Sequence, residues 1–191
     1  MCKHPVPDQR SAGPLALSQL RAWRPPTLGT MEAVTVRELF AGETAAAADV
    51  LLNLRETVGP AERLVTRIDE LQRPEGYRLV ASFDEEGRTV AAAGFRVGHN
   101  LAWGRFLYVD DLITLPEARG EGHATALLRW VLEEAARLGC GQVHLDSGTE
   151  RHAAHRLYLG VGMHISSHHF RIDSPSVAGP ELGGQSPKLC G

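Results

Sequence analysis

A strand, a glycine-bearing turn, a helix and a second strand follow one another in the chain, and this order constrains the fold most. Residues 105–113 have the pattern of a strand, and the turn after them contains Gly120 and Gly122. Over 124–138 the apolar residues fall on one face of a helix. Residues 142–146 then return as a strand. This order predicts a βαβ unit with two parallel strands.

The elements before this unit are predicted from apolar spacing. Residues 34–39 resemble a short strand, and Thr44 is expected to cap a helix that continues to about Thr57. A second helix follows, with four apolar residues at helical spacing: Leu64, Val65, Ile68 and Leu71. Alternating residues predict strands over 77–83 and 89–97, joined by a hairpin turn. These elements predict an α+β domain.

We expect the compact domain to span residues 32–173. Residues 1–30 contain five prolines and no sustained period, which predicts a flexible N-terminal extension. Residues 174–191 are rich in Gly, Ser and Pro, which predicts a flexible C-terminal tail.

Composition and charge disfavour several classes of function. The net charge is −3, whereas a nucleic-acid binder usually has a basic excess. No apolar run reaches the ~18 residues that a membrane helix needs, and the start of the chain lacks a secretory pattern. The three cysteines have no regular spacing. We therefore expect a cytoplasmic protein that binds neither nucleic acid nor membrane.

The glycine turn has the properties of an anion-binding site. Gly120 and Gly122 lack a Cβ atom, so the backbone there can bend tightly and approach a ligand closely. The first amides of the following helix are unpaired, and that helix end carries a partial positive charge. Together these features suit phosphate or pyrophosphate. A tight turn without a ligand is the alternative.

Two other phosphate-binding motifs fit this turn poorly. A P-loop needs a lysine, and the turn has none. A dinucleotide fold needs a third glycine where Thr125 stands, although Asp146 follows the next strand at the place of a ribose-binding acid. A dinucleotide-dependent enzyme therefore stays an alternative.

Residues 112–124 resemble the acetyl-coenzyme A motif of the GNAT N-acetyltransferase superfamily, whose core is Arg/Gln-x-x-Gly-x-Gly/Ala. Arg119, Gly122 and Ala124 fill its three defined positions. Residues 154–158, with Gly162 and Met163, resemble the later helix of the family. Residues 151–159 are also similar, locally, to the aminoalkylphosphonate acetyltransferase branch. The resemblance covers nearly the whole compact domain.

This resemblance implies both a fold and an activity. The fold is a mixed, mostly antiparallel sheet flanked by helices, with one βαβ unit that holds the cofactor. The activity is transfer of an acetyl group from acetyl-CoA directly to a primary amine of a small molecule or peptide, and a homodimer is a further expectation. Arg151 stands where the family often has an asparagine that contacts the cofactor. A non-catalytic acyl-CoA-binding or sensor domain is therefore an alternative.

The resemblance also implies a cofactor site. The turn amides would bind the pyrophosphate, and the edge of the preceding strand would pair with the pantetheine arm. The expected cofactor residues are Leu112, Ile113, Thr114, Arg119, Gly120, Glu121, Gly122, His123, Ala124 and Thr125.

Acyl transfer to an amine also needs a base for the amine and an acid for the leaving thiolate. Tyr158 occupies the family's tyrosine position and is the expected acid. Asp146 and Asp111 are the candidate bases, and Asp110 is a weaker one. Asp110 and Asp111 are adjacent on a strand, so one of them faces the acceptor cleft in either register. Arg55, Glu56 and Arg63, near the junction of the first two helices, are candidates for substrate contact.

Nine histidines raise the question of a metal site. His152 and His155 lie three residues apart on one predicted helix. His168 and His169 are neighbours on a predicted strand and would point to opposite faces, which does not suit two ligands of one metal. We therefore expect no metal.

Overall fold

The computed structural model describes residues 34–173. The predicted extension and tail, at 1–30 and 174–191, lie outside the described residues. The strands are β1 (Thr35–Leu39), β2 (Arg78–Phe83), β3 (Thr89–Asn100), β4 (Gly104–Thr114) and β5 (Gln142–Leu145). The α-helices are α1 (Ala48–Leu52), α2 (Ala61–Thr66), α3 (His123–Arg137) and α4 (His152–Gly160). Shorter helical turns are η2 (Thr44–Ala47), η3 (Glu56–Val58), η4 (Arg67–Gln72), η5 (Arg73–Glu75) and η6 (Pro116–Ala118).

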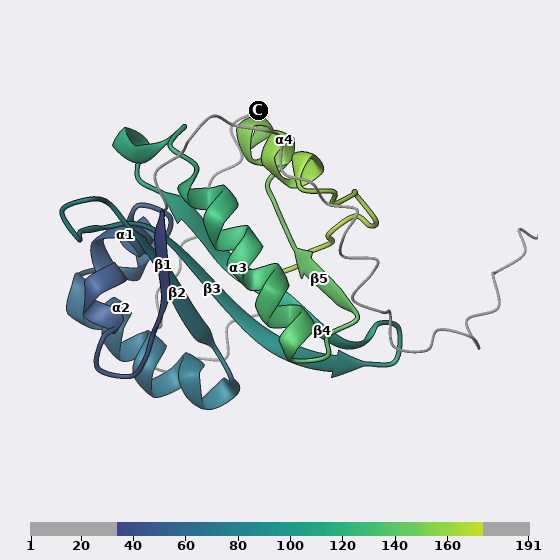
Figure 1. The fold of residues 1–191 in the computed structure, drawn as a ribbon. Coiled ribbons are helices and arrows are strands. Elements are labelled where there is room, and N and C mark those ends of the chain that lie inside the picture. Colours follow the sequence, from purple (N-terminus) through teal and green to yellow (C-terminus); the bar gives the residue numbers. More distant parts are fainter. Residues whose placement is uncertain (1–33, 174–191) are drawn as a thin grey trace, which may run out of the picture.

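The five strands form one sheet in the order β1-β2-β3-β4-β5 (Figure 1). Neighbouring strands are antiparallel, except that β4 and β5 are parallel and are connected through α3. The predicted mixed sheet with one parallel βαβ unit is therefore confirmed.

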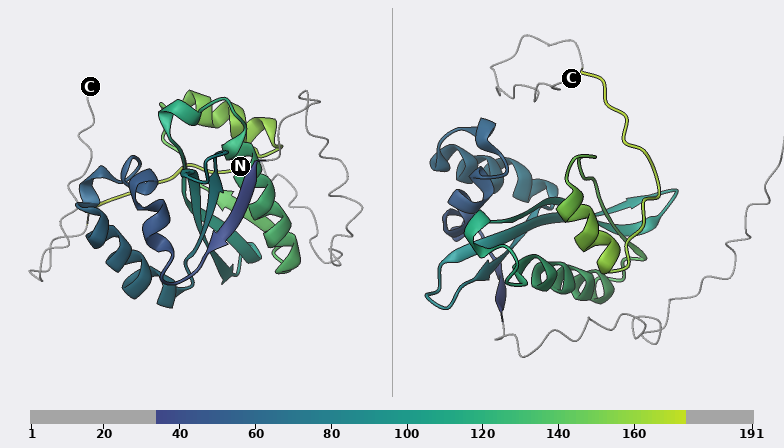
Figure 2. Two further views of the ribbon diagram at one scale, coloured as in Figure 1. Left: turned by 60° about the vertical axis from the view of Figure 1, so that its left-hand side comes forward. Right: turned by 90° about the horizontal axis from the view of Figure 1, so that it is seen from above.

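The sheet has a hydrophobic core on each face, with α1 and α2 on one side and α3 on the other (Figure 2). Along β2, Leu79 and Ala81 pack with residues of α1 and α2, whereas Val80 packs with residues of α3. Alternate residues of a strand point to opposite faces. Both faces of the central strands are therefore apolar, and the predicted helices on both faces are confirmed.

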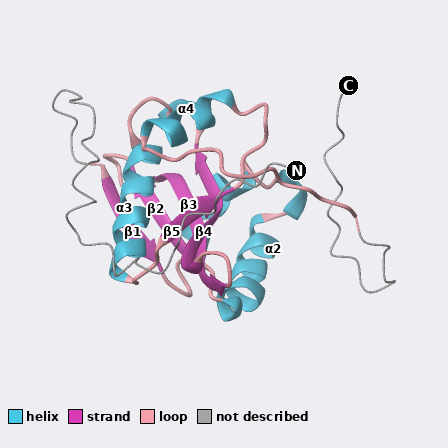
Figure 3. Cartoon of the chain, turned by 90° about the vertical axis from the view of Figure 1, so that its right-hand side faces the viewer, coloured by secondary structure: helices cyan, strands magenta, loops and turns pink. Residues whose placement is uncertain are grey.

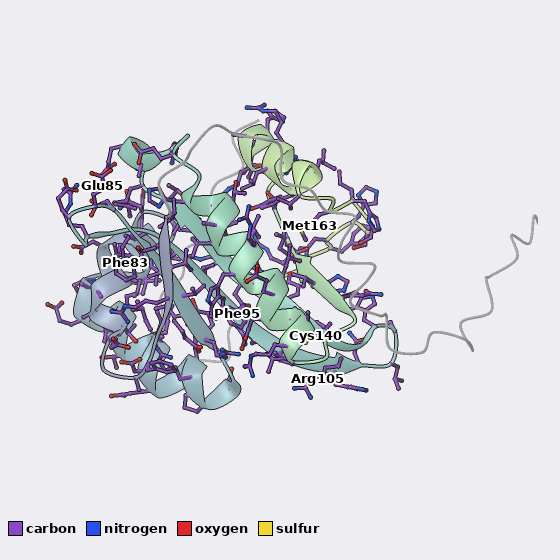
Figure 4. The ribbon with its side chains drawn as sticks, viewed as in Figure 1. Phe83, Glu85, Phe95, Arg105, Cys140 and Met163 are labelled. Atoms are coloured by element: carbon purple, nitrogen blue, oxygen red, sulfur yellow. The ribbon has the colours of Figure 1, made fainter. Side chains whose placement is uncertain are left out.

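Arg78 connects the sheet to α3. It pairs with Glu38 of β1 at 2.6 Å and with Glu134 of α3 at 2.5 Å, and its guanidinium lies over the ring of Phe95. Phe95, labelled beneath α3 in Figure 4, also contacts Trp130 of α3, with ring centroids 5.9 Å apart. These contacts fix the position of α3 on the sheet.

The first predicted helix is shorter than expected. The α-helix ends at Leu52 rather than near Thr57, and the chain makes separate short turns on either side of it. Thr44 does not cap this helix. It is fully buried, and its hydroxyl donates to Asp69 at 2.5 Å and accepts a hydrogen bond from Arg73. The cap prediction was wrong because this tertiary contact uses the hydroxyl.

The second predicted helix changes its winding along its length. Leu64 and Ile68 are buried as predicted, but Leu71 is 50% exposed. From Arg67 to Gln72 the chain is a π-helix, which has more residues per turn than an α-helix. The wider turn carries Leu71 off the apolar face that α-helical spacing predicted.

After α4 the chain continues as a loop, drawn in pink in Figure 3. Residues 161–173 contain no strand, so the predicted strand around His168 and His169 was wrong. None of the helices within residues 34–173 combines the length and the apolar character needed to cross a membrane.

Replacing Glu134 by Gln should destabilise the fold at pH 7 and have much less effect in acid. Hydrogen bonds from Arg137 and Arg78 lower the pKa of Glu134 from 4.5 to about 2, against the opposing effect of burial. A lowered folded-state pKa contributes stability above the unfolded-state value and loses it as pH falls toward the folded-state value. We expect Glu134→Gln to reduce the free energy of unfolding by about 1 kcal/mol at pH 7. That difference should fall to less than half by about pH 3.

Glu133→Gln is the matched control, because Glu133 is the exposed neighbour on the same helix. Chemical denaturation of both variants between pH 7 and 3 measures the difference. If Glu134→Gln loses as much unfolding free energy at pH 3 as at pH 7, the lowered pKa of Glu134 is contradicted.

Candidate active site

A cavity of about 220 Å³ opens where β4 and β5 separate. The two strands pair only between Phe106–Val109 and Gln142–Leu145, whereas β4 continues to Thr114. The cavity is lined by Leu54, Arg55, Val109, Asp110, Leu112, Leu145, Asp146, Ser147, Gly148, Glu150, Arg151 and Tyr158. Of the predicted acid and bases, Tyr158, Asp146 and Asp110 line this cavity, and Asp111 does not.

A β-bulge in β4 decides which aspartate lines the cavity. Gly94 of β3 pairs with Asp111 and Phe95 pairs with Val109, so Asp110 is an extra residue in β4. The regular alternation on which the sequence argument rested is interrupted at this residue.

Asp111 belongs to a buried network rather than to the cavity wall. It is 9% exposed, and its carboxylate accepts hydrogen bonds from the Tyr77 hydroxyl and from Arg55, both at 2.8 Å. Burial and the charge of Asp111 raise the pKa of Tyr77 well above 10, so the hydroxyl stays a donor. A Cβ atom at Gly94 would lie 1.7 Å from this hydroxyl oxygen. Glycine at that position therefore allows the network to form.

Two arginines hold the bulge in place. Arg55 donates to the backbone carbonyl of Asp110 at 3.0 Å, in addition to pairing with Asp111. Arg96 of β3 binds the Asp110 carboxylate through two hydrogen bonds, at 2.9 and 3.0 Å. Burial raises the pKa of Asp110, and the hydrogen bonds from Arg96 oppose this shift. Asp110 therefore faces the cavity with its carboxylate already occupied.

Asp146 follows β5 and is about half exposed. Its Oδ2 atom accepts a hydrogen bond from the hydroxyl of Tyr108 on β4. Burial and the contact with Asp146 raise the pKa of Tyr108, so this hydroxyl also stays protonated. The same carboxylate oxygen lies 3.1 Å from Nδ1 of His169.

Tyr158 reaches the cavity from α4. Its hydroxyl makes no hydrogen bond within the described part of the chain. Burial raises its pKa above 10, and the charge of Arg151 partly opposes the shift. The side chain thus presents an uncommitted, protonated hydroxyl. The Ser147 hydroxyl, also in the cavity wall, is buried without a partner in the described residues.

The glycine turn is built on two left-handed glycines, which allow the tight bend expected from the sequence. Gly120 and Gly122 have φ angles of +91° and +93°, a backbone conformation that residues with a Cβ atom rarely adopt. Gly122 is the N-cap of α3, and no side chain caps this helix end. The first turn of the helix begins with the hydrogen bond from Ala126 to the carbonyl of Gly122. The amides just before Ala126 are therefore free for an anion.

The other predicted cofactor residues surround this turn. Leu112, Ile113 and Thr114 are the last residues of β4, beyond its pairing with β5. The Thr114 hydroxyl is buried without a partner among residues 34–173. His123 turns its side chain inward and forms a 2.8 Å hydrogen bond with Ser82, so only its backbone remains for a ligand. The free strand edge, the orphaned hydroxyl and the free amides fit a long thioester with a diphosphate.

The histidines serve separate purposes. Among residues 34–173, no three His, Cys, Asp or Glu side chains are arranged to hold a metal ion. His144 stacks on Trp103 at 3.9 Å, and burial lowers its pKa. His169 contacts Asp146.

Four side chains around the cavity were not predicted from the sequence: Tyr77, Arg96, Tyr108 and His169. Each contacts a residue on another element. For Tyr77, Arg96 and Tyr108, that partner lies 14 to 38 residues away in the sequence. Alternation along the strands marked Tyr77 as a core residue, but no local pattern pairs it with Asp111.

The chain is similar to known acetyltransferases. The sequence profile of the Acetyltransferase (GNAT) family matches residues 46–163. The uncharacterized N-acetyltransferase YhdJ of Bacillus subtilis is 32% identical over 112 residues, which cover 58% of this chain and 78% of YhdJ. The aminoalkylphosphonate N-acetyltransferase of Salmonella typhimurium is 38% identical over 64 residues, 34% of this chain and 40% of that protein.

Solved structures share the fold. The structure of AAC(6')-Iy in complex with a CoA-S-monomethyl-acetylneamine bisubstrate analogue superposes with a TM-score of 0.67 at 13% identity. The match covers 76% of this chain and all of that one.

Combining Tyr77→Phe with Asp111→Ala should reveal strong coupling in the free energy of unfolding. A hydrogen bond to a buried charged group contributes about 1.5–3 kcal/mol, and both variants remove the same bond. We expect a coupling energy in that range from a double-mutant cycle measured by denaturation.

Tyr108→Phe with Asp111→Ala is the control cycle, because the Tyr108 hydroxyl bonds to Asp146 instead. Its two effects should add to within about 0.5 kcal/mol. Additive effects in the Tyr77 cycle would refute the buried network.

Proposed function

The chain belongs to the acetyltransferase (GNAT) family and transfers an acetyl group from acetyl-CoA to an amine, and on this premise we propose where its acceptor binds. The acceptor is a small primary amine that enters the cavity between β4 and β5. The observation that carries the proposal is the convergence of Tyr158 and Asp146, from separate elements, on that one cavity.

The size and charge of the cavity support a small polar acceptor. About 220 Å³ has room for an aminoalkyl group rather than for a folded peptide segment. Both signs of charge line it, with Asp146 and Glu150 opposed to Arg55 and Arg151. Arg55 is engaged by Asp111, whereas the nearest carboxylate to Arg151 is that of Glu150, 3.9 Å away. Arg151 can therefore bind an anionic group on the acceptor, such as the phosphonate of an aminoalkylphosphonate.

Acetyl-CoA supplies the activated acetyl group when it is bound. We propose that the free amides at the start of α3 hold its diphosphate and that the unpaired edge from Leu112 to Thr114 holds its pantetheine arm. Gly120 and Gly122 allow the backbone to approach the diphosphate. Arg119, which donates to the Thr114 carbonyl at 3.4 Å, ties the turn to the strand end.

Two side chains move protons. An amine must be neutral to attack, and we propose that the Asp146 carboxylate takes its proton. Asp111, the other base expected from the sequence, is occupied by Tyr77 and Arg55. Tyr158 holds a proton at its hydroxyl and gives it to the departing sulfur. Because burial raises the pKa of Tyr158, this proton stays in place through neutral pH.

A release assay for free CoA thiol tests the function. We expect turnover with at least one member of a panel of aminoalkylphosphonates, amino acids, polyamines and aminoglycosides. Acetyl-CoA binding without turnover of any amine would favour a sensor domain. A cytoplasmic location and a homodimer remain predictions from the sequence.

Gly122→Ala should weaken acetyl-CoA binding about tenfold. A Cβ atom at a φ of +93° strains the turn by about 1–2 kcal/mol, and relief of that strain moves the amides that hold the diphosphate. Calorimetric titration with acetyl-CoA measures the effect.

Gly139→Ala is the control. Gly139 follows the other end of the same helix with a φ of +70°. Alanine there is therefore strained in a similar way but lies away from the proposed cofactor site. Its acetyl-CoA affinity should stay within about twofold of wild type. Equal losses of acetyl-CoA affinity in the two variants would contradict the proposed cofactor site at the glycine turn.

Tyr158→Phe should lower kcat about a hundredfold, because it removes the proton donor for the thiolate. The dissociation constant for acetyl-CoA should change less than about twofold, since the ring remains. Steady-state kinetics and calorimetry separate these effects. Wild-type kcat in the phenylalanine variant would remove Tyr158 from the mechanism.

A further inference from the structure

Asp146 lies between the cavity and a histidine at the protein surface. Its Oδ2 atom accepts the Tyr108 hydrogen bond and lies 3.1 Å from Nδ1 of His169. Asp146 lines the cavity, whereas His169 is not part of the lining and is 65% exposed. The imidazole therefore contacts the carboxylate from the solvent side.

The other carboxylate oxygen of Asp146 is uncommitted. Both contacts are made to Oδ2, and Oδ1 has no hydrogen bond or ion pair within residues 34–173. One oxygen is thus held in position while the other can receive a proton from the cavity.

Several charged and titratable groups surround this carboxylate on different elements. They are Tyr108 and Asp110 on β4, His144 on β5, Arg55 after α1, Glu150 and Arg151 before α4, Tyr158 on α4, and His169 in the loop after α4. Asp110 is bound by Arg96, and Tyr108 is held protonated. Among residues 34–173, the side chains in contact with the Asp146 carboxylate are Tyr108 and His169, so His169 is the contacting group that can accept a proton and also reach solvent.

We propose that His169 relays the acceptor's proton from Asp146 to solvent. This inference rests on the proposed function, since it concerns the amine that the cavity would bind. The ammonium N–H bond breaks and its proton passes to Oδ1 of Asp146. Rotation of the carboxyl group brings this proton to Nδ1 of His169, in the tautomer that carries its hydrogen on Nε2. The imidazolium then releases the Nε2 proton to water, and exchange with water restores the starting tautomer. The neutral amine forms the amide bond as the carbon–sulfur bond breaks. The second nitrogen proton replaces the one that Tyr158 gives to sulfur, so each turnover releases one proton.

The order of acid strengths supports this direction. A carboxylic acid is a stronger acid than an imidazolium by about two to three pKa units in model compounds. A proton on the carboxyl group therefore passes favourably to a neutral imidazole in contact with it. The relay regenerates the carboxylate before the next acceptor binds.

Two substitutions of His169 distinguish a role in proton transfer from a role in holding Asp146 in position. His169→Asn retains a polar amide at the place of Nδ1 that can hydrogen-bond to Asp146 but cannot carry a proton, whereas His169→Ala removes both functions. We expect both variants to lose about tenfold or more in kcat at pH 7. In both, the pH profile of kcat should differ from that of wild type. Added imidazole should restore turnover to His169→Ala.

His168→Ala is the matched control, because His168 is the exposed neighbour and makes no contact with Asp146. It should retain wild-type kcat, and thermal denaturation should show all three variants folded. Wild-type kcat and pH profile in His169→Asn would overturn the relay, whatever the alanine variant does. Equal behaviour of His168→Ala and His169→Ala would also overturn it.

The wild-type protein tests the proposed function separately. If it binds acetyl-CoA and acetylates an amine while the His169 variants behave like wild type, only the relay fails. If it neither binds acetyl-CoA in calorimetry nor releases thiol, the proposed function fails and the relay fails with it.

Discussion

The candidate site exists because backbone pairing between β4 and β5 stops after Val109 and Leu145. Beyond that point β4 leaves its outer edge unpaired, which is costly unless a ligand or a side chain uses those groups. Arg55 donates to the Asp110 carbonyl and Arg119 to the Thr114 carbonyl, and between them β4 has no pairing with β5. The same separation makes room for the cavity. The proposed sites for the cofactor and the acceptor therefore both lie where the pairing of β4 with β5 stops.

Ion pairs and a hydrogen bond stabilise β4 just beyond the point where its pairing with β5 stops. Asp110 and Asp111 are adjacent carboxylates in a partly apolar setting, an arrangement that is unfavourable without compensation. Arg96 neutralises one, and Arg55 with Tyr77 neutralises the other. With these two acids satisfied, Asp146 and Tyr158 are the groups of the cavity wall that we propose to exchange protons with the acceptor and the thiolate.

Glycine acts twice in this arrangement, for different physical reasons. At Gly122 the left-handed backbone conformation opens the start of α3 and leaves no side chain to compete for its amides. At Gly94 the absent Cβ atom gives space to the Tyr77 hydroxyl. The first effect is local and visible as a motif, whereas the second depends on a residue seventeen positions away in the chain.

The sequence by itself determined the βαβ unit, the glycine turn and the helix face that packs on the sheet, because helical periodicity and left-handed glycines are properties of neighbouring residues. It also predicted that Tyr158, Asp146 and an aspartate of β4 would meet a cleft. It could not determine which aspartate, because a single extra residue at Asp110 changes the direction of the side chains around it. Only the tertiary structure decided the ends of the early helices, the partners of Asp111 and the place of His169. These depend on contacts between side chains as far as 56 residues apart, and such contacts leave no periodic signal in the chain.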